Sequence, residues 1–161
     1  MLRRFYYISY DSGFLSIHCH EIIANMIRLG IKVDLFMPDN VKLSFELYGA
    51  CVTHRIPVYF KTTLLSFFYQ VLLIFGLLPA IKRDGRPDMI YARQNYLGIL
   101  PVFFARMFRI PYFAEVNGMA KRGESRNVDI KLYLKAFLDQ AGGKLWNELI
   151  NRMHTIYCSV R

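Results

Sequence analysis

Cysteine is scarce in this chain, and the three cysteines present lie far apart. Cys19, Cys51 and Cys158 form no C-x-x-C pair of the kind that binds zinc or carries redox chemistry, and their odd number does not suggest a disulfide framework. The first ten residues contain an Arg-Arg pair but only a short apolar stretch before Asp11, too short for a signal peptide. Together these features predict a cytoplasmic protein.

The sequence also lacks the motifs of a sequence-specific nucleic-acid binder. It has no recognition helix, zinc-finger spacing or RNP-like segment, although its formal net charge is +9. Such an excess favours an anionic partner, for example phospholipid headgroups or a phosphorylated substrate. Because the basic residues lie in small scattered groups, nucleic acid is not an expected partner. The groups are Arg3 and Arg4; Lys82, Arg83 and Arg86; and Lys121, Arg122 and Arg126.

Length and composition limit the architecture. The 161 residues fit one domain and leave no room for a second one of full size. Hydrophobic residues make up 54% of the chain, above the roughly 45 to 50% of an average soluble domain. We therefore expect apolar surface that serves a partner or a membrane.

Strand-like and helix-like segments alternate along the chain. Short apolar runs are followed by segments in which apolar residues recur every three or four positions. The expected strands are Phe5–Ser9, Ile31–Met37, Arg55–Tyr59, Asp88–Ala92, Tyr112–Val116 and Thr155–Ser159. The expected helices are one between an N-cap at Ser16 and a C′ residue at Gly30, then Thr62–Ile81, Leu97–Phe108 and Lys131–Arg152. This order predicts an α/β fold, a Rossmann-like parallel sheet with helices on both faces.

A parallel sheet of this kind binds ligands beyond the carboxyl ends of its strands. The residues that follow those ends, at positions 11–16, 93–95 and 115–118, are therefore the candidates for a site. The turn after the first strand has no G-x-G-x-x-G, and no acidic residue ends the second strand before Pro38. Both absences disfavour a dinucleotide-binding oxidoreductase.

The segment Thr62–Ile81 contains no charged residue and is flanked by Lys61 and by Lys82 and Arg83. Its length matches the roughly 20 residues that span a bilayer. A spanning helix would, however, separate the first two strands from the rest of one sheet, so we expect an ordinary crossover helix.

Both faces of this helix are largely apolar. We expect the sheet to cover Leu64, Phe67, Phe68, Val71, Ile74, Phe75 and Leu78. The outer face would then consist of Leu65, Ser66, Tyr69, Gln70, Leu73, Gly76 and Leu77. An exposed apolar stripe beside basic residues predicts peripheral docking on an anionic membrane surface, at the inner face of the membrane. A partner domain or a dimer that covers the stripe is the alternative.

The stretch from Asp11 to Pro38 resembles the opening of family-four glycosyltransferases, with a Gly-containing loop after the first strand, a helix, and a Gly before a strand that ends in Pro. Arg86–Gln94 (RPDMIYARQ) and Arg109–Gly118 (RIPYFAEVNG) follow in the family's order. The resemblance runs from about Arg4 to Ser159. It implies that residues 1–161 are the N-terminal, acceptor-side domain of a GT-B type enzyme, one half of that fold, and that the C-terminal nucleotide-sugar domain is absent from this sequence.

The resemblance also implies a reaction. In the family, this half holds the acceptor, often a lipid-linked or growing polysaccharide, and the second domain holds the nucleotide sugar. A hexosyl group is transferred in the cleft between the domains, typically with retention and without a metal or other cofactor. The second domain's basic phosphate-binding pair and E-x7-E motif have no counterpart here, so the chain alone is expected to be inactive. The alternative is a non-catalytic subunit that recruits a separate donor domain to the membrane.

Seven residues become candidates for substrate binding, and none for catalysis or metal binding. They are Gly13, Ser16, His18, Arg93, Glu115, Asn117 and Gly118. Gly13 is expected near the donor phosphates, because a residue without Cβ lets backbone N–H groups approach an anion; it could equally serve a plain turn. Asn117 stands where many relatives carry histidine. Its amide could bind a sugar hydroxyl but could not take a proton. It could instead form a turn with Gly118.

The remaining candidates also allow two interpretations. Arg93 and Glu115 could form a structural ion pair or present charge to the acceptor. His18 and His20 are two positions apart and diverge around the helix axis, so they predict no metal site. His18 lies close enough to the loop after the first strand to contact substrate.

Overall fold

The computed structural model describes residues 2–11, 13–57, 63–94, 99–116 and 157–158. Strands and helices alternate in it as predicted. The strands are β1 (Arg4–Ser9), β2 (Lys32–Pro38), β3 (Val52–Ile56), β4 (Met89–Gln94), β5 (Tyr112–Val116) and β6 (Tyr157–Cys158). The helices are α1 (Ile17–Arg28), α2 (Thr63–Asp84) and α3 (Ile99–Met107), with a one-turn helix η1 (Phe45–Leu47). The expected helix Lys131–Arg152 lies outside the described residues.

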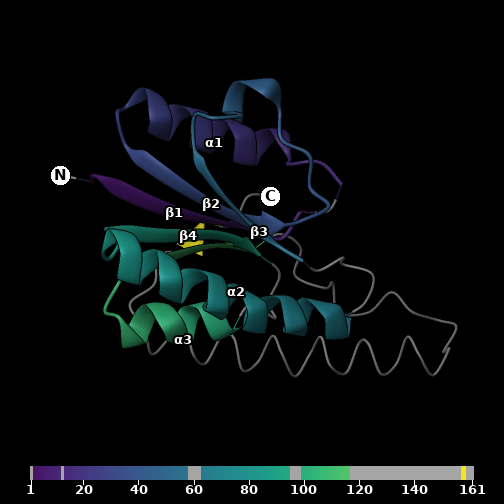
Figure 1. Ribbon diagram of the computed structural model, residues 1–161, viewed down its shortest axis with the longest axis vertical. Coiled ribbons are helices and arrows are strands. Elements are labelled where there is room, and N and C mark those ends of the chain that lie inside the picture. The colour runs from purple at the N-terminus through teal and green to yellow at the C-terminus, as the bar shows by residue number, and fades with distance from the viewer. Residues whose placement is uncertain (1, 12, 58–62, 95–98, 117–156, 159–161) are drawn as a thin grey trace, which may run out of the picture.

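The strands form one parallel sheet in the order β3-β2-β1-β4-β5-β6. Figure 1 shows α1 on one face of this sheet and α2 and α3 on the other. The predicted Rossmann-like fold is therefore confirmed. The chain builds outward from β1 to β3 and then returns to the centre with β4, so the strand order reverses between β1 and β4. In sheets of this order, ligands bind at the carboxyl ends of the strands beside that reversal.

Each face of the sheet has its own hydrophobic core, because successive side chains of a strand point to opposite faces. On the α1 side, Tyr7 and Leu35 pack with Ile23 of α1. On the α2 side, Ile8 and Phe36 belong to a second core. Because both faces are buried, the central strands are nearly continuous apolar runs, as is typical of parallel sheets.

The ends of α1 agree with the prediction. The Ser16 hydroxyl accepts the backbone N–H of Cys19 at 3.3 Å and so caps the first turn. Gly30 follows the last turn with φ +75°, and its N–H donates to the Ile27 carbonyl at 2.9 Å. The N–H of Ile31 donates to the Met26 carbonyl at 3.0 Å, which completes a Schellman motif. The left-handed conformation is the reason for glycine at this position.

The predicted bounds of the third strand are wrong. The sequence places it at Arg55–Tyr59, whereas β3 runs from Val52 to Ile56 and residues 58–59 lie outside the described part. Among the described strands, β3 lies beside β2 alone. His54 approaches Asp34 of β2, and the Arg55 guanidinium donates to the carbonyl of Asp39, which follows β2, at 2.8 Å. A polar edge strand lacks the apolar alternation that identifies strands from sequence.

The prediction for the face of α2 that packs on the sheet is wrong for most of its residues. Phe67, Phe68 and Phe75 are exposed, whereas Leu73 and Leu77 are completely buried. Tyr69 and Gln70, expected outside, are buried as well. Ile74 and Leu78, expected at the sheet, are half-buried and do pack against this core. The side chains of Leu64, Leu65 and Ser66 lie outside the described part.

Polar and small residues on the buried face of α2 explain this difference. The Tyr69 hydroxyl donates to the Ser9 carbonyl at 2.8 Å, and Gln70 Oε1 accepts the backbone N–H of Leu100 in α3 at 3.1 Å. Gly76 permits close approach of β3, since a Cβ there would lie 3.1 Å from a side-chain carbon of that strand. Because both faces are apolar, hydrophobicity alone does not determine which face of α2 is buried. These specific contacts determine it.

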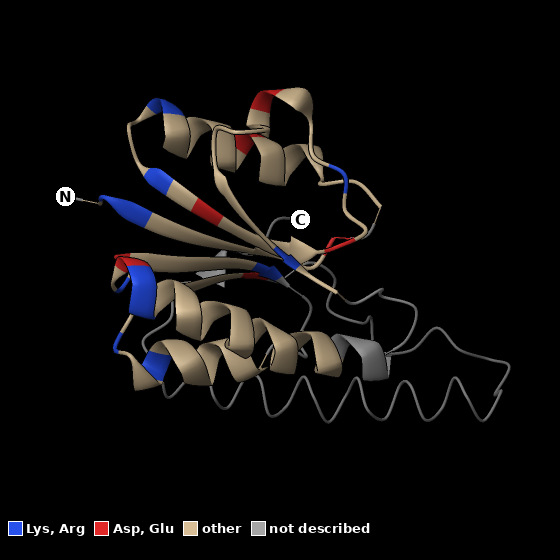
Figure 2. Ribbon diagram, in the orientation of Figure 1, with Lys and Arg blue, Asp and Glu red and all other residues tan. Residues whose placement is uncertain are grey.

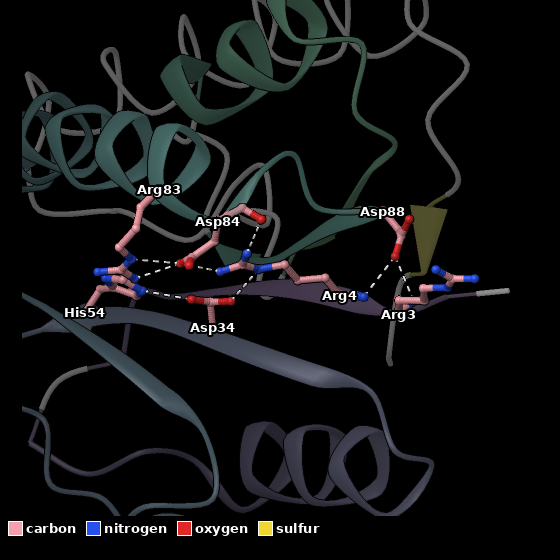
Figure 3. A network of polar contacts seen from close by, with 7 residues as sticks. All are labelled: Arg3, Arg4, Asp34, His54, Arg83, Asp84 and Asp88. Atoms are coloured by element: carbon pink, nitrogen blue, oxygen red, sulfur yellow. Dashed lines mark hydrogen bonds and ion pairs between the residues drawn. The ribbon is translucent and has the colours of Figure 1, made fainter.

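A charged network joins the strands to the end of α2 (Figure 3). Arg4 Nε donates to Asp34 Oδ2 at 2.9 Å, and Arg4 Nη2 donates to Asp84 Oδ2 at 2.8 Å. His54 Nε2 lies 3.0 Å from the other oxygen of Asp34, which is completely buried. Arg3, Arg83 and Asp88 complete the network. Since Arg4 begins β1, the network lies away from the ligand-binding edge and has a structural role.

None of the described helices combines the length and the apolar character needed to cross a membrane.

Candidate functional site

Polar side chains gather at the carboxyl ends of β1, β4 and β5. The register places Ser9, the last residue of β1, beside Arg93 of β4, and Arg93 beside Glu115 of β5. Ser16 and His18 reach the same place from the start of α1. The structure thus brings together four of the seven predicted residues, at the reversal of strand order where such sheets bind ligands.

Arg93 is the centre of this cluster. Its Nη1 is hydrogen-bonded to Ser16 Oγ and lies 3.7 Å from Asp11 Oδ1, and its Nε lies 3.7 Å from Glu115 Oε1. Burial acts to lower the pKa of the Arg93 guanidinium, but the neighbouring Cys19, Asp11 and Glu115 outweigh it and raise the pKa. The permanently charged guanidinium thus pairs with both carboxylates, and the structural ion pair between Arg93 and Glu115 is present.

The Glu115 carboxylate is only 3% exposed and has further partners. The Tyr91 hydroxyl donates to Oε2 at 2.9 Å, and His18 Nε2 lies 3.2 Å from the same oxygen. The His18 side chain, in contrast, is 47% exposed. Of this pair, only the imidazole is accessible to a ligand.

The loop between β1 and α1 is held by backbone contacts. The Gly13 carbonyl accepts the N–H of Lys42 at 2.8 Å, and the N–H of Leu15 donates to the Lys42 carbonyl at 3.2 Å. Gly13 has φ +78°, and a Cβ there would meet nothing within 4 Å. The left-handed backbone, not crowding, therefore accounts for glycine. Contact of this loop with donor phosphates stays a prediction.

Asp11 organises the start of α1. Its Oδ2 accepts the backbone N–H of Ser16 at 3.1 Å and the Cys19 thiol at 3.2 Å. Burial raises the pKa of that thiol, which therefore stays protonated and serves the packing of the loop. Among the residues that the structure describes, no three His, Cys, Asp or Glu side chains are grouped as a metal site would require.

Two members of the site, Asp11 and Tyr91, are not among the seven predicted residues. Asp11 lies two residues beyond the end of β1 and falls within the candidate positions 11–16, although it is not one of the seven selected residues. Tyr91 shares a face of β4 with Arg93, but its role depends on the hydrogen bond to Glu115 in the neighbouring strand. Asn117 and Gly118 lie outside the described residues, so their roles stay predictions.

Comparison with known proteins identifies the family of this chain. The family model of the glycosyl transferase 4-like domain matches residues 15–152. No curated protein matches the chain. Among solved structures, apo UGT2 of Phytolacca americana is similar with a TM-score of 0.47 and 8% identity over 73% of this chain. The chain spans 30% of the length of that plant protein. The family match covers most of the sequence, and this chain belongs to the glycosyl transferase 4-like domain family.

Proposed function

We propose that this chain is the acceptor-binding, membrane-docking half of a retaining glycosyltransferase. The complete enzyme transfers a hexosyl group from a nucleotide sugar, which a second domain binds, to a lipid-linked or polysaccharide acceptor. The observation that carries the proposal is the cluster of Arg93, His18, Ser16 and Glu115 at the reversal of strand order in a glycosyltransferase-family domain. The exposed imidazole and the backbone of the Gly13 loop supply hydrogen-bonding groups for hydroxyls and phosphates.

The proposed binding of acceptor and nucleotide sugar by separate domains can be tested directly. Residues 1–161 alone are expected to show no sugar transfer and no affinity for nucleotide sugars in isothermal titration, because the donor is proposed to bind elsewhere. The complete protein, given a radiolabelled nucleotide sugar and a membrane lipid extract, should transfer label to the extract. Micromolar binding of a nucleotide sugar to residues 1–161 would refute the assignment of this half to the acceptor.

The proposed membrane surface consists of the exposed apolar side chains of α2 and α3, two helices that pack against each other. We call it the α2/α3 surface. It contains Phe67, Phe68, Leu72 and Phe75 of α2 and Phe103 and Met107 of α3. Exposed apolar side chains concentrated on two adjacent helices favour an apolar partner.

Basic residues border the α2/α3 surface. Lys82 is two helical turns beyond Phe75 and so shares its face of α2, and Arg106 lies one turn beyond Phe103 on α3. Figure 2 shows Lys and Arg at the same end of both helices, with Asp84 also at that end of α2, and uncharged residues along the rest of the described parts of α2 and α3. This combination of apolar and cationic groups complements an anionic bilayer surface.

Vesicle co-sedimentation across salt concentrations tests the α2/α3 surface. Changing Phe68 and Phe75 to Ser should weaken binding to anionic vesicles at every salt concentration. Changing Lys82 and Arg106 to Gln should weaken it mainly at low salt, because each charge near the surface contributes about 1 kcal/mol and salt screens it. Phe45, which is exposed on η1 across the sheet, supplies the control: Phe45→Ser should change nothing. Wild-type protein that ignores anionic vesicles would contradict membrane docking.

A further inference from the structure

Phe14 and Lys42 form an exposed pair beside the candidate site. They are partners in a short parallel bridge between the loop after β1 and the segment after β2. The N–H and the carbonyl of Lys42 are hydrogen-bonded to the two neighbours of Phe14, at 2.8 and 3.2 Å. Two residues beyond Phe14, the Ser16 hydroxyl contacts Arg93. The pair therefore belongs to the loop that reaches the centre of the site.

The backbone of this bridge holds both side chains outward. Side chains alternate along extended segments, and the neighbours of the pair, Leu15, Val41 and Leu43, pack in the core on the α1 side of the sheet. Phe14 is consequently 71% exposed, and Lys42 is exposed as well. Because hydrogen bonds already fix the backbone, a ligand that binds here orders little further structure.

The pair combines an apolar ring with a positive charge. Lys42 Nζ lies 5.6 Å from the centroid of the Phe14 ring, which is a cation–π distance. In the described part of the chain, Lys42 has no carboxylate partner, since Asp39 and Glu46, the acidic residues closest in sequence, contact other side chains. The charge of Lys42 is therefore accessible to an anionic ligand.

A sugar that carries a negative charge fits both groups. The C–H face of a pyranose ring is apolar and packs flat on an aromatic ring, as the face of a nucleobase does. A carboxylate or phosphate forms a charge-assisted hydrogen bond with a lysine ammonium group. The α2/α3 surface lies on the other side of the sheet from α1 (Figure 1), so this pair is not part of the proposed membrane surface.

We propose that Phe14 and Lys42 bind one sugar unit of the acceptor, with the Phe14 ring stacked on the sugar and Lys42 paired with a negative charge that the sugar carries. The charge is a carboxylate of the sugar or a phosphate attached to it. This inference rests on the proposed function for the identity of the bound sugar as acceptor, and it selects anionic saccharides among the acceptors. The two residues determine specificity and take no part in the chemical step.

Titrations of the 161-residue chain with small sugars test the pair directly. Glucose, glucuronate and glucose 1-phosphate share one ring and differ in charge, and proton–nitrogen correlation spectra report the affinity and the position of each. At least one charged sugar should bind about threefold more tightly than glucose and shift the amide signals of residues 13–15 and 41–43. The tighter of the two identifies the anion. Equal affinity for all three sugars, or no shifts at these positions, would overturn the proposal.

Two variants separate the ring from the charge. Phe14→Leu keeps an apolar side chain without the ring and should weaken binding of every sugar about fivefold. Lys42→Gln should weaken only the charged sugars, about threefold and mainly at low salt. The matched controls Phe45→Leu and Lys32→Gln, at exposed residues elsewhere, should change nothing. Unchanged binding by Phe14→Leu would refute the stacking, and an undiminished preference of Lys42→Gln for charged sugars would refute the ion pair.

Kinetics of the complete protein connect the pair to the acceptor. Phe14→Leu should raise KM for the acceptor about fivefold and leave kcat and the KM for the nucleotide sugar unchanged, because the contact is the same in the ground state and the transition state. This variant should also bind anionic vesicles as the wild type does, and a loss of vesicle binding would identify Phe14 as a membrane contact instead. A wild-type protein without sugar transfer would overturn the proposed function, while the titrations would still decide whether the pair binds sugars.

Discussion

Replacing Asp34 by alanine is expected to lower the free energy of unfolding by about 3 kcal/mol, as found when one partner of a buried ion pair is removed. Asp34 is completely buried and accepts hydrogen bonds from Arg4 Nε at 2.9 Å and His54 Nε2 at 3.0 Å. Its loss leaves the largely buried guanidinium of Arg4 with Asp84 as its one remaining carboxylate partner in the described part of the chain. Urea denaturation at neutral pH measures the effect.

The matched control for this substitution is Asp39→Ala. The Asp39 side chain is 48% exposed and lies 3.9 Å from Arg55 Nη1, so its replacement should cost less than about 1 kcal/mol. Equal losses for the two variants would show that the network at Asp34 contributes no more than a surface pair.

The effect of Asp34 should also depend on pH. Burial acts to raise the pKa of the Asp34 carboxyl, but the hydrogen bonds from His54 and Arg4 outweigh it and lower the pKa. A lowered pKa in the folded state stabilises the fold above the unfolded pKa of about 3.9, and this contribution is lost as the pH falls through the folded value. The difference between wild type and Asp34→Ala should therefore narrow below about pH 4. A difference that stays constant to pH 2 would contradict this origin.

Two adjacent leucines on α2 should respond very differently to replacement by alanine. Leu73 is completely buried in the core between α2 and the sheet, so Leu73→Ala is expected to cost about 3 kcal/mol through lost apolar burial and the cavity left behind. Leu72 is 36% exposed and does not belong to this core, so Leu72→Ala should cost less than about 1 kcal/mol. Thermal or urea unfolding of the two variants compares the faces directly.

This pair of variants separates packing from membrane docking. Leu72→Ala should weaken vesicle binding with little loss of stability, because Leu72 belongs to the α2/α3 surface. Leu73→Ala should lower the stability strongly, while the protein that remains folded should bind vesicles as the wild type does. If Leu72→Ala proved the more destabilising variant, the orientation of α2 would be wrong.

Sequence reasoning predicted those parts of the candidate site that depend on local structure. Ser16 and Gly30 were identifiable as the ends of α1, because capping depends on residues within one or two turns. Arg93 and Glu115 were identifiable because they lie near the ends of strands in a parallel sheet. Tyr91 was not identifiable, because its hydrogen bond to Glu115 depends on the register between β4 and β5. The two residues lie 24 positions apart in the sequence.

The sequence by itself determined the α/β class, the order of the elements and the parallel sheet. Apolar periodicity and turn residues act over a few positions, and short crossovers between neighbouring strands follow from them. Only the tertiary structure decided which face of α2 is buried, since both faces are apolar and the choice depends on partners such as the Ser9 carbonyl for Tyr69. It also decided the partners of buried charges: Arg4 pairs with Asp34 and Asp84, residues 30 and 80 positions away. The partner of a buried charge depends on which segments the fold brings together, and no local pattern in the sequence specifies that contact.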